Sequence, residues 1–89
     1  MRKPIYTNQF ERDVRRMQRR GKETDKLKAV LTALIAEQPL AERHRDHALV
    51  GNYRGRRECH IEPDWLLIYL PTENEIIFER TGTHADLFE

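Results

Sequence analysis

Three side chains able to exchange protons alternate along the chain just ahead of an apolar segment. His60, Glu62 and Asp64 precede the run from Trp65 to Leu70, whose length and composition predict a buried strand. Side chains two residues apart lie on the same face of an extended chain, so we expect these three to share one face. Imidazole and carboxylate groups transfer protons near neutral pH, which makes acid-base chemistry the first hypothesis for this segment.

A fourth candidate, His84, lies just beyond a second apolar run, Ile76 to Phe78. The sequence Pro71 to Asn74 between the two runs is typical of a turn. An antiparallel pairing across it brings His84 to the end of the sheet that carries His60 and Asp64. The sequence therefore predicts a cluster of titratable groups on a rigid platform.

Two more histidines, His44 and His47, stand three residues apart, a spacing that can bind a metal on a helix. No third ligand follows at a suitable short spacing, and the neighbours Cys59 and His60 point to opposite faces of a strand. We therefore expect no metal site and no cofactor, and His47 needs another explanation.

Hydrophobic periodicity indicates two helices and several strands. Phe10, Val14 and Met17 repeat at helical spacing behind a capping Thr7 or Asn8. The expected elements are a strand at 4–7, a helix ending at Gly21, a helix at 25–37 stopped by Pro39, an irregular segment at 40–52, strands at 53–61, 65–70 and 75–80, and at most one helical turn at 85–88.

This order predicts the α+β class, with two antiparallel helices packed on one face of a four-stranded, mainly antiparallel sheet. Eighty-nine residues allow one small domain, spanning 1–89. The other face of the sheet would then be partly open. Titratable side chains on an open sheet face are typical of a binding surface.

The composition favours a soluble, cytoplasmic protein with no membrane partner. The longest apolar run is far shorter than the ~20 residues that cross a bilayer, and the first residues lack the apolar core of a signal peptide. The one cysteine, Cys59, cannot form an internal disulfide and fits a reducing compartment. In a strand it is expected to be a packing residue.

The net charge of +1 conceals an uneven distribution. Residues 1–57 hold fifteen of the sixteen Lys and Arg and seven of the fifteen Asp and Glu, whereas the rest of the chain carries a net negative charge. A basic surface of this kind suits phosphate contacts. Its members are the first-helix stripe Arg12, Arg15, Arg16 and Arg19, the lysines Lys22, Lys26 and Lys28, and the group Arg54, Arg56 and Arg57.

Four motifs together resemble the RelE superfamily of bacterial toxins from toxin-antitoxin pairs, and within it the YafQ branch. They are Lys26-Leu27-Lys28, Asp46-His47-Ala48-Leu49-Val50-Gly51, Cys59-His60-Ile61-Glu62-Pro63-Asp64-Trp65-Leu66-Leu67-Ile68-Tyr69, and Phe78-Glu79-Arg80-Thr81-Gly82-Thr83-His84-Ala85-Asp86-Leu87-Phe88. The resemblance spans essentially the whole chain.

The resemblance implies a ribosome-dependent endoribonuclease, an mRNA interferase that cuts messenger RNA in the aminoacyl site and so inhibits translation. It also implies a cognate antitoxin, with a ribbon-helix-helix DNA-binding domain, that neutralises the toxin. The branch's catalytic and RNA-binding positions correspond to His47, His60, Asp64, Trp65, His84 and Phe88, with Arg80 in support. The archetypal member of the superfamily relies on Lys, Arg and Tyr, so this branch resembles a histidine and carboxylate version.

Metal-free RNA cleavage uses the 2′-hydroxyl as nucleophile and needs a base, an acid and a group that stabilises phosphate charge. Our hypothesis places His60 and Asp64 at the 2′-hydroxyl, His84 at the leaving 5′-oxygen, and Arg80 or His47 against the phosphate. Asp64 can serve as base or orient a histidine, and swapped acid and base roles stay open. The expected products carry a 2′,3′-cyclic phosphate or 3′-phosphate and a 5′-hydroxyl.

Two aromatic residues near these groups have different expected roles. Phe88 is expected to stack on a base and Trp65 to support the fold, while Glu62 and Glu79 stay outside the chemistry. Gly82 is expected to form the turn that aims His84.

Two other classes of function fit the same residues. A non-cleaving translation inhibitor that binds the ribosome or RNA would need the basic groups but not the histidines. An inactive antitoxin-binding subunit would form a complex and do nothing more.

Overall fold

A five-stranded sheet forms the centre of the protein, seen here in a computed structural model that describes residues 1–88. The strands are β1 (Lys3–Tyr6), β2 (His47–Ala48), β3 (Arg57–Glu62), β4 (Trp65–Pro71) and β5 (Glu75–Gly82). Their spatial order is β1-β5-β4-β3-β2, and only the β1–β5 pair is parallel. The first strand therefore reaches the sheet edge beside the last one.

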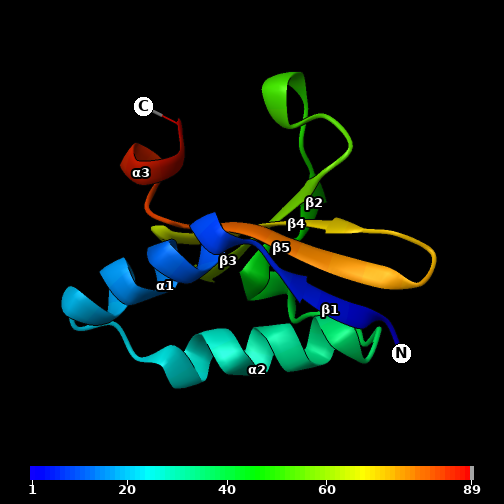
Figure 1. The fold of residues 1–89 in the computed structure, drawn as a ribbon, viewed down its shortest axis with the longest axis horizontal. Helices are drawn as coiled ribbons and strands as arrows, with labels where there is room; N and C mark the ends of the chain where they lie inside the picture. The colour runs from blue at the N-terminus through cyan, green and yellow to red at the C-terminus, as the bar shows by residue number, and fades with distance from the viewer. Residues whose placement is uncertain (89) are drawn as a thin grey trace.

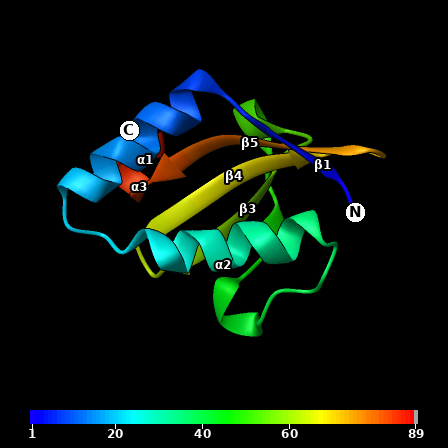
Figure 2. The ribbon, with the colours of Figure 1, turned by 60° about the horizontal axis from the view of Figure 1, so that its bottom comes forward.

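Two helices, α1 (Asn8–Arg19) and α2 (Thr24–Ile35), cover one face of the sheet. Thr7 caps α1 by accepting a hydrogen bond from the Phe10 amide at 3.0 Å. The short α3 (His84–Phe88) lies on the opposite face (Figure 1). Figure 2 shows the α1–α2 hairpin across the strands, and the sheet is thus enclosed between unequal layers.

The core divides along β4 because its side chains alternate between the two faces. Trp65, Leu67 and Tyr69 pack against the two long helices, whereas Leu66 and Ile68 pack with Leu87 of α3 on the other face. The first five of the seven β4 residues, Trp65 to Tyr69, are buried. This second cluster, which Leu49 and Tyr53 extend, is the smaller of the two.

The α+β class, the helix pair and the mainly antiparallel sheet are confirmed, but the strand count is corrected from four to five. The additional strand β2 lies in the segment expected to be irregular, where His47 pairs with Glu58 and Ala48 with Arg57. Two residues are too few to produce a periodic pattern.

Several element boundaries also differ from the prediction. The strand expected at 53–61 begins only at Arg57, because η2 (Gly51–Tyr53) is a 3-10 helix, and β5 continues to Gly82. A second 3-10 helix, η1 (Glu42–His44), lies in the segment before β2. Within residues 1–88, no helix has the length and apolar character needed to cross a membrane.

The expectation that His60, Glu62 and Asp64 share one face is wrong for Glu62. The β3–β4 pairing shifts register between His60 and Glu62, and this irregularity breaks the alternation. Glu62 instead pairs with Lys22 at 2.7 Å and Lys26 at 2.9 Å, beside the long helices. Asp64 follows in the turn before β4.

Candidate active site

Asp64 and His84 form the closest titratable pair of the site. The Asp64 Oδ1 lies 2.6 Å from His84 Nδ1 and accepts a second hydrogen bond from the His84 backbone amide at 2.9 Å. These bonds, first from the amide and then from the ring, lower the pKa of Asp64. Because an ionised carboxylate only accepts, Nδ1 carries the proton, and Nε2 is the ring nitrogen that can meet another group.

His47 of β2 and His60 of β3 are each oriented by a backbone carbonyl. The Nδ1 atom lies 2.6 Å from the Arg45 oxygen in His47 and 3.2 Å from the Pro63 oxygen in His60. Carbonyl oxygens only accept, so Nδ1 is the donor in both rings. The Nε2 atoms are therefore the ones that face other groups of the site.

Both Nε2 atoms approach one buried carboxylate, that of Glu58. Its Oε1 lies 3.4 Å from His47 Nε2 and 3.7 Å from His60 Nε2, and the residue is only 5% exposed. Glu58 was not among the predicted site residues. Its position two residues before His60 in one strand is the signal that would have found it.

Four aromatic rings run in a row across the open face of the sheet. Ring centroids are 6.5 Å apart for His47 and His60, 6.0 Å for His60 and His84, and 6.4 Å for His84 and Phe88. The four residues expected to be catalytic, with Asp64 hydrogen-bonded to His84, thus lie together. Phe88 ends the row 45% exposed.

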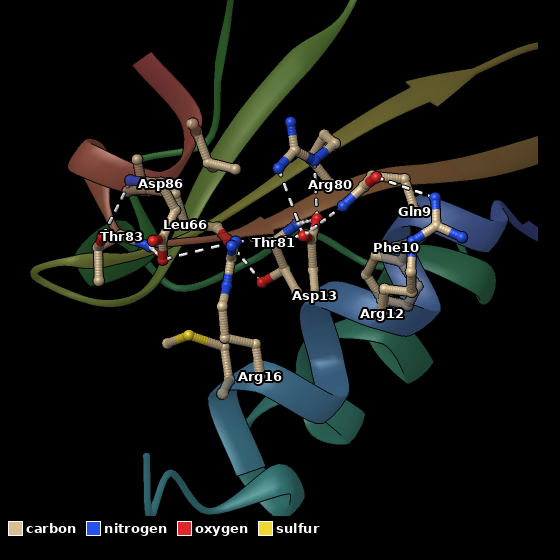
Figure 3. A network of polar contacts seen from close by, with 12 residues as sticks. Gln9, Phe10, Arg12, Asp13, Arg16, Leu66, Arg80, Thr81, Thr83 and Asp86 are labelled. Atoms are coloured by element: carbon tan, nitrogen blue, oxygen red, sulfur yellow. Dashed lines mark hydrogen bonds and ion pairs between the residues drawn. The ribbon is translucent and has the colours of Figure 1, made fainter. Parts of the chain in front are cut away.

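Arg80 of β5 is held by a buried carboxylate of α1 (Figure 3). Asp13, which is 1% exposed, accepts from Arg80 Nε at 2.8 Å and Nη2 at 3.3 Å. It also accepts from the Thr81 amide at 3.1 Å and from Arg16 at 3.2 Å. The hydrogen bond to Asp13 raises the pKa of Arg80, so Arg80 is a fixed cation.

A second carboxylate, Asp86, anchors α3 to α1. It accepts from Arg20 Nη1 at 2.6 Å and from the Thr83 amide at 2.9 Å, and Arg16 lies 3.7 Å away. The Arg20 contact above all holds the pKa of Asp86 well below its usual range. A Cβ atom at Gly82 would lie 2.9 Å from Asp86 Oδ2, so this close approach requires glycine.

Other predicted site residues occupy different surroundings. Trp65 is completely buried and donates from Nε1 to Thr81 Oγ1 at 2.9 Å, so it supports the fold and cannot stack on RNA here. Phe88 packs edge-to-face on Tyr53 at 5.6 Å. Cys59 lies in the core, where burial raises its pKa to about 12.

The predicted basic surface divides into exposed and paired side chains. On α1, Arg12, Arg15 and Arg19 are exposed, but Arg16 turns toward Asp13 and Asp86, which corrects the continuous four-residue stripe. Lys28 and Arg54 are also exposed. Four others form ion pairs: Lys22 and Lys26 with Glu62, Arg56 with Glu79, and Arg57 with Asp46.

Comparisons of the sequence and of the structure with known proteins point to the same family. The family described as "Bacterial toxin of type II toxin-antitoxin system, YafQ" matches residues 2–89. The mRNA interferase toxin YafQ of Escherichia coli K12 is 48% identical over 84 residues, covering 93% of this chain and 91% of its own length.

Solved structures agree with this sequence match. YafQ from E. coli BL21(DE3) has a TM-score of 0.95 at 44% identity, and the E. coli DinJ-YafQ complex has one of 0.94 at 46%, each covering 100% of both chains. A metal-bound toxin from Helicobacter pylori has a TM-score of 0.92 at 36% identity, covering 99% of this chain and 100% of its own.

The five-stranded fold is that of a RelE-like toxin. More narrowly, the chain belongs to the YafQ family of bacterial toxins of type II toxin-antitoxin systems.

Proposed function

We propose that this protein is a ribosome-dependent endoribonuclease that cuts messenger RNA in the ribosomal A site by general acid-base catalysis. The observation that carries the proposal is the 2.6 Å contact between His84 Nδ1 and Asp64 Oδ1, next to a second imidazole. The ring centroids of His84 and His60 are 6.0 Å apart. Two imidazoles facing one space can serve the two proton transfers of RNA cleavage. The E. coli relative named an mRNA interferase supports the same reaction.

His84 is assigned as the general acid at the leaving 5′-oxygen. Its Nδ1 is occupied by Asp64, so only Nε2 can meet the RNA. Of the two roles open to Asp64, orienting a histidine now fits better than acting as base. His60, beside the Glu58 carboxylate, is assigned to the 2′-hydroxyl, and His47 lies next to it in the row.

Arg80 and Phe88 are assigned to binding. Arg80 keeps its charge through Asp13 and remains 25% exposed at its side chain, which suits stabilisation of phosphate charge. Phe88 presents a half-exposed ring beside His84, and a base stacked on it would gain ~1–3 kcal/mol. The reacting nucleotide would then lie between Phe88 and His60.

Docking on the ribosome is assigned to the exposed basic side chains. Arg12, Arg15 and Arg19 extend from α1, on the face of the sheet away from the aromatic row. An 89-residue domain has little surface to hold and bend a messenger strand, and ribosomal RNA would supply that orientation. A cognate antitoxin partner is proposed from the E. coli DinJ-YafQ complex, and a ribbon-helix-helix domain in it and a cytoplasmic location are proposed from the family resemblance.

Primer extension on a defined messenger in a purified translation system tests the proposal. Wild type and His84→Ala are compared with and without ribosomes, and new ends within codons should require both ribosomes and His84. Product ends should be a cyclic or 3′-phosphate and a 5′-hydroxyl. Translation arrest without new ends would favour a non-cleaving inhibitor, and complex formation without arrest an inactive antitoxin-binding subunit.

Whether cleavage is independent of metal ions needs a separate experiment, since a related H. pylori toxin is metal-bound. Among residues 1–88, no group of three or more His, Cys, Asp or Glu side chains is arranged to hold a metal ion. Cleavage is expected to persist when 1,10-phenanthroline, a chelator of transition metals, is added at a magnesium concentration that keeps the ribosome assembled. A magnesium-dependent cut that leaves a 5′-phosphate would contradict the mechanism.

A further inference from the structure

Two arginines in the segment before β2 belong to none of the predicted groups. Arg43 lies in η1, Arg45 is the first residue after that helix, and both side chains are exposed. Among residues 1–88, no carboxylate lies within ion-pair distance of either guanidinium. Their charges are therefore available to an external anion.

The segment that carries them is fixed to the candidate active site at two points. His44 Nδ1 lies 2.6 Å from the His60 carbonyl oxygen, and the Arg45 carbonyl oxygen lies 2.6 Å from His47 Nδ1. Arg45 also has a φ of 45°, a left-handed conformation that costs a non-glycine residue energy and recurs at functional sites. The backbone that orients His47 thus also places the two arginines.

A groove of about 460 Å³ connects these arginines to the catalytic row. It is lined by Arg43, Arg45, His60, Ile61, Glu62 and Pro63. It adjoins a second hollow of about 480 Å³ that shares Arg43, Ile61, Glu62 and Pro63 and extends to Lys26 on α2. A polymer held at His60 has a path leading away from the site.

Among residues 1–88, Glu62 is the one carboxylate that lines the groove and the adjoining hollow, and its charge is already compensated. Glu62 is paired with Lys22 at 2.7 Å and Lys26 at 2.9 Å, and these hydrogen bonds lower its pKa. Its negative charge therefore does little to offset Arg43 and Arg45. The groove is basic where it opens beside His60.

We propose that this groove binds the messenger strand adjoining the cut, with Arg43 and Arg45 contacting the phosphate next to the scissile one. The proposal rests on the proposed function and adds a subsite to it. Guanidinium groups match phosphate geometry and charge, and a single strand follows a basic groove through its backbone. An acidic segment of a protein partner is the competing occupant, and its signature is part of the test.

The first experiment is single-turnover cleavage on programmed ribosomes by excess toxin carrying Arg43→Gln or Arg45→Gln. The half-saturating toxin concentration should rise by about threefold to tenfold, because one phosphate contact is lost, while the rate at saturation stays within about twofold of wild type. Lys3→Gln, which removes one exposed positive charge from β1, is the matched control and should behave as wild type.

The second experiment neutralises the phosphate instead of the arginine. Two messengers are compared, and each carries one uncharged methylphosphonate, one linkage away from the scissile phosphate. In one messenger the modified linkage lies on the 5′ side of the cut, and in the other it lies on the 3′ side. On one of these two messengers, wild type should lose the same factor that the double variant Arg43→Gln/Arg45→Gln loses on natural messenger, and the double variant should lose nothing further. A ribosomal RNA contact would make the two losses multiply.

Three outcomes overturn the proposal. The first is that the losses caused by the arginine substitution and by the uncharged phosphate multiply. The second is that the half-saturating toxin concentration is unchanged in both variants. The third is that cleavage stays intact while the antitoxin complex weakens, which would assign the groove to the protein partner. Failure of the proposed function looks different, because then wild type itself makes no His84-dependent cut on natural messenger.

Discussion

Asp64 accepts two hydrogen bonds from a single residue, His84, one from the backbone amide at 2.9 Å and one from ring Nδ1 at 2.6 Å. The turn before β4 thereby positions both the first residue of α3 and the plane of its imidazole. Sequence separation between the two is twenty residues, and only the β4–β5 pairing brings them together. This relationship makes Asp64 the natural target of the first substitution.

Asp64→Asn should lower the maximal single-turnover rate by about tenfold to a hundredfold, because the amide keeps an acceptor but loses the charge. Since the pKa of Asp64 is lowered, the carboxylate stays ionised across the working range. The Asp64 carboxylate itself should therefore add no inflection to the wild-type pH–rate profile between about pH 5.5 and about pH 8. Glu73→Gln, an exposed change in the β4–β5 turn, is the control, and an Asp64→Asn rate within about twofold of the wild-type rate would contradict this account.

Glu58→Gln should reduce the maximal rate by about tenfold or more, because the charge shared by His47 and His60 is removed while the side-chain shape is kept. The same single-turnover assay measures it. Glu79→Gln is a matched control, since Glu79 pairs with Arg56 instead of a histidine. Equal rates for the Glu58→Gln and Glu79→Gln variants would show that the Glu58 charge does not contribute to cleavage.

Asp86→Asn should lower the free energy of unfolding by about 1–3 kcal/mol at neutral pH, because the charged acceptor of Arg20 and Thr83 is lost. The folded pKa of Asp86 lies below its unfolded value of about 3.9, so its contribution is full above that value and is lost as pH falls toward the folded pKa. Urea unfolding at several pH values should show the two proteins converging in acid. A gap that widens on acidification would contradict this sign.

Arg15→Glu should weaken productive docking on ribosomes and leave the chemical step unchanged. We expect the half-saturating toxin concentration to rise by about tenfold at low salt, with a smaller difference at high salt, because phosphate contacts are screened. Lys3→Glu is the control for charge reversal at an exposed position outside the stripe. Unchanged ribosome binding by Arg15→Glu would exclude this part of α1 from docking.

Cys59 should resist alkylation in the folded protein at about pH 8. It is completely buried, and burial raises its pKa to about 12, so little thiolate is present. Iodoacetamide labelling followed by mass spectrometry should show modification only after unfolding in urea. Rapid labelling of the native protein would show that the core around β3 opens readily.

Much of the local structure follows from residue patterns alone. The apolar spacing of Phe10, Val14 and Met17 predicts α1, and the continuous run from Trp65 predicts β4, because burial selects these periods directly. The opposite orientations of Cys59 and His60 follow from strand alternation, and the structure confirms them.

Residue types and motif spacing also indicated the catalytic candidates and their chemistry, since His and Asp are among the few side chains suited to proton transfer near neutral pH. Their proximity was an expectation that depended on the predicted pairing of two strands. His47 had no such argument, because the strand β2 that holds it is only two residues long.

The tertiary structure alone decided which partner each charged residue takes. Asp13 reaches Arg80 across sixty-seven residues, Glu62 turns to the lysines of the helix side at a register shift, and Glu58 is buried between two histidines. Such contacts depend on how elements distant in sequence pack together, and no local pattern encodes that distance. Local periodicity therefore determined the elements and the candidate groups, whereas packing of α1, α3 and the sheet decided how those groups are charged, oriented and joined into a site.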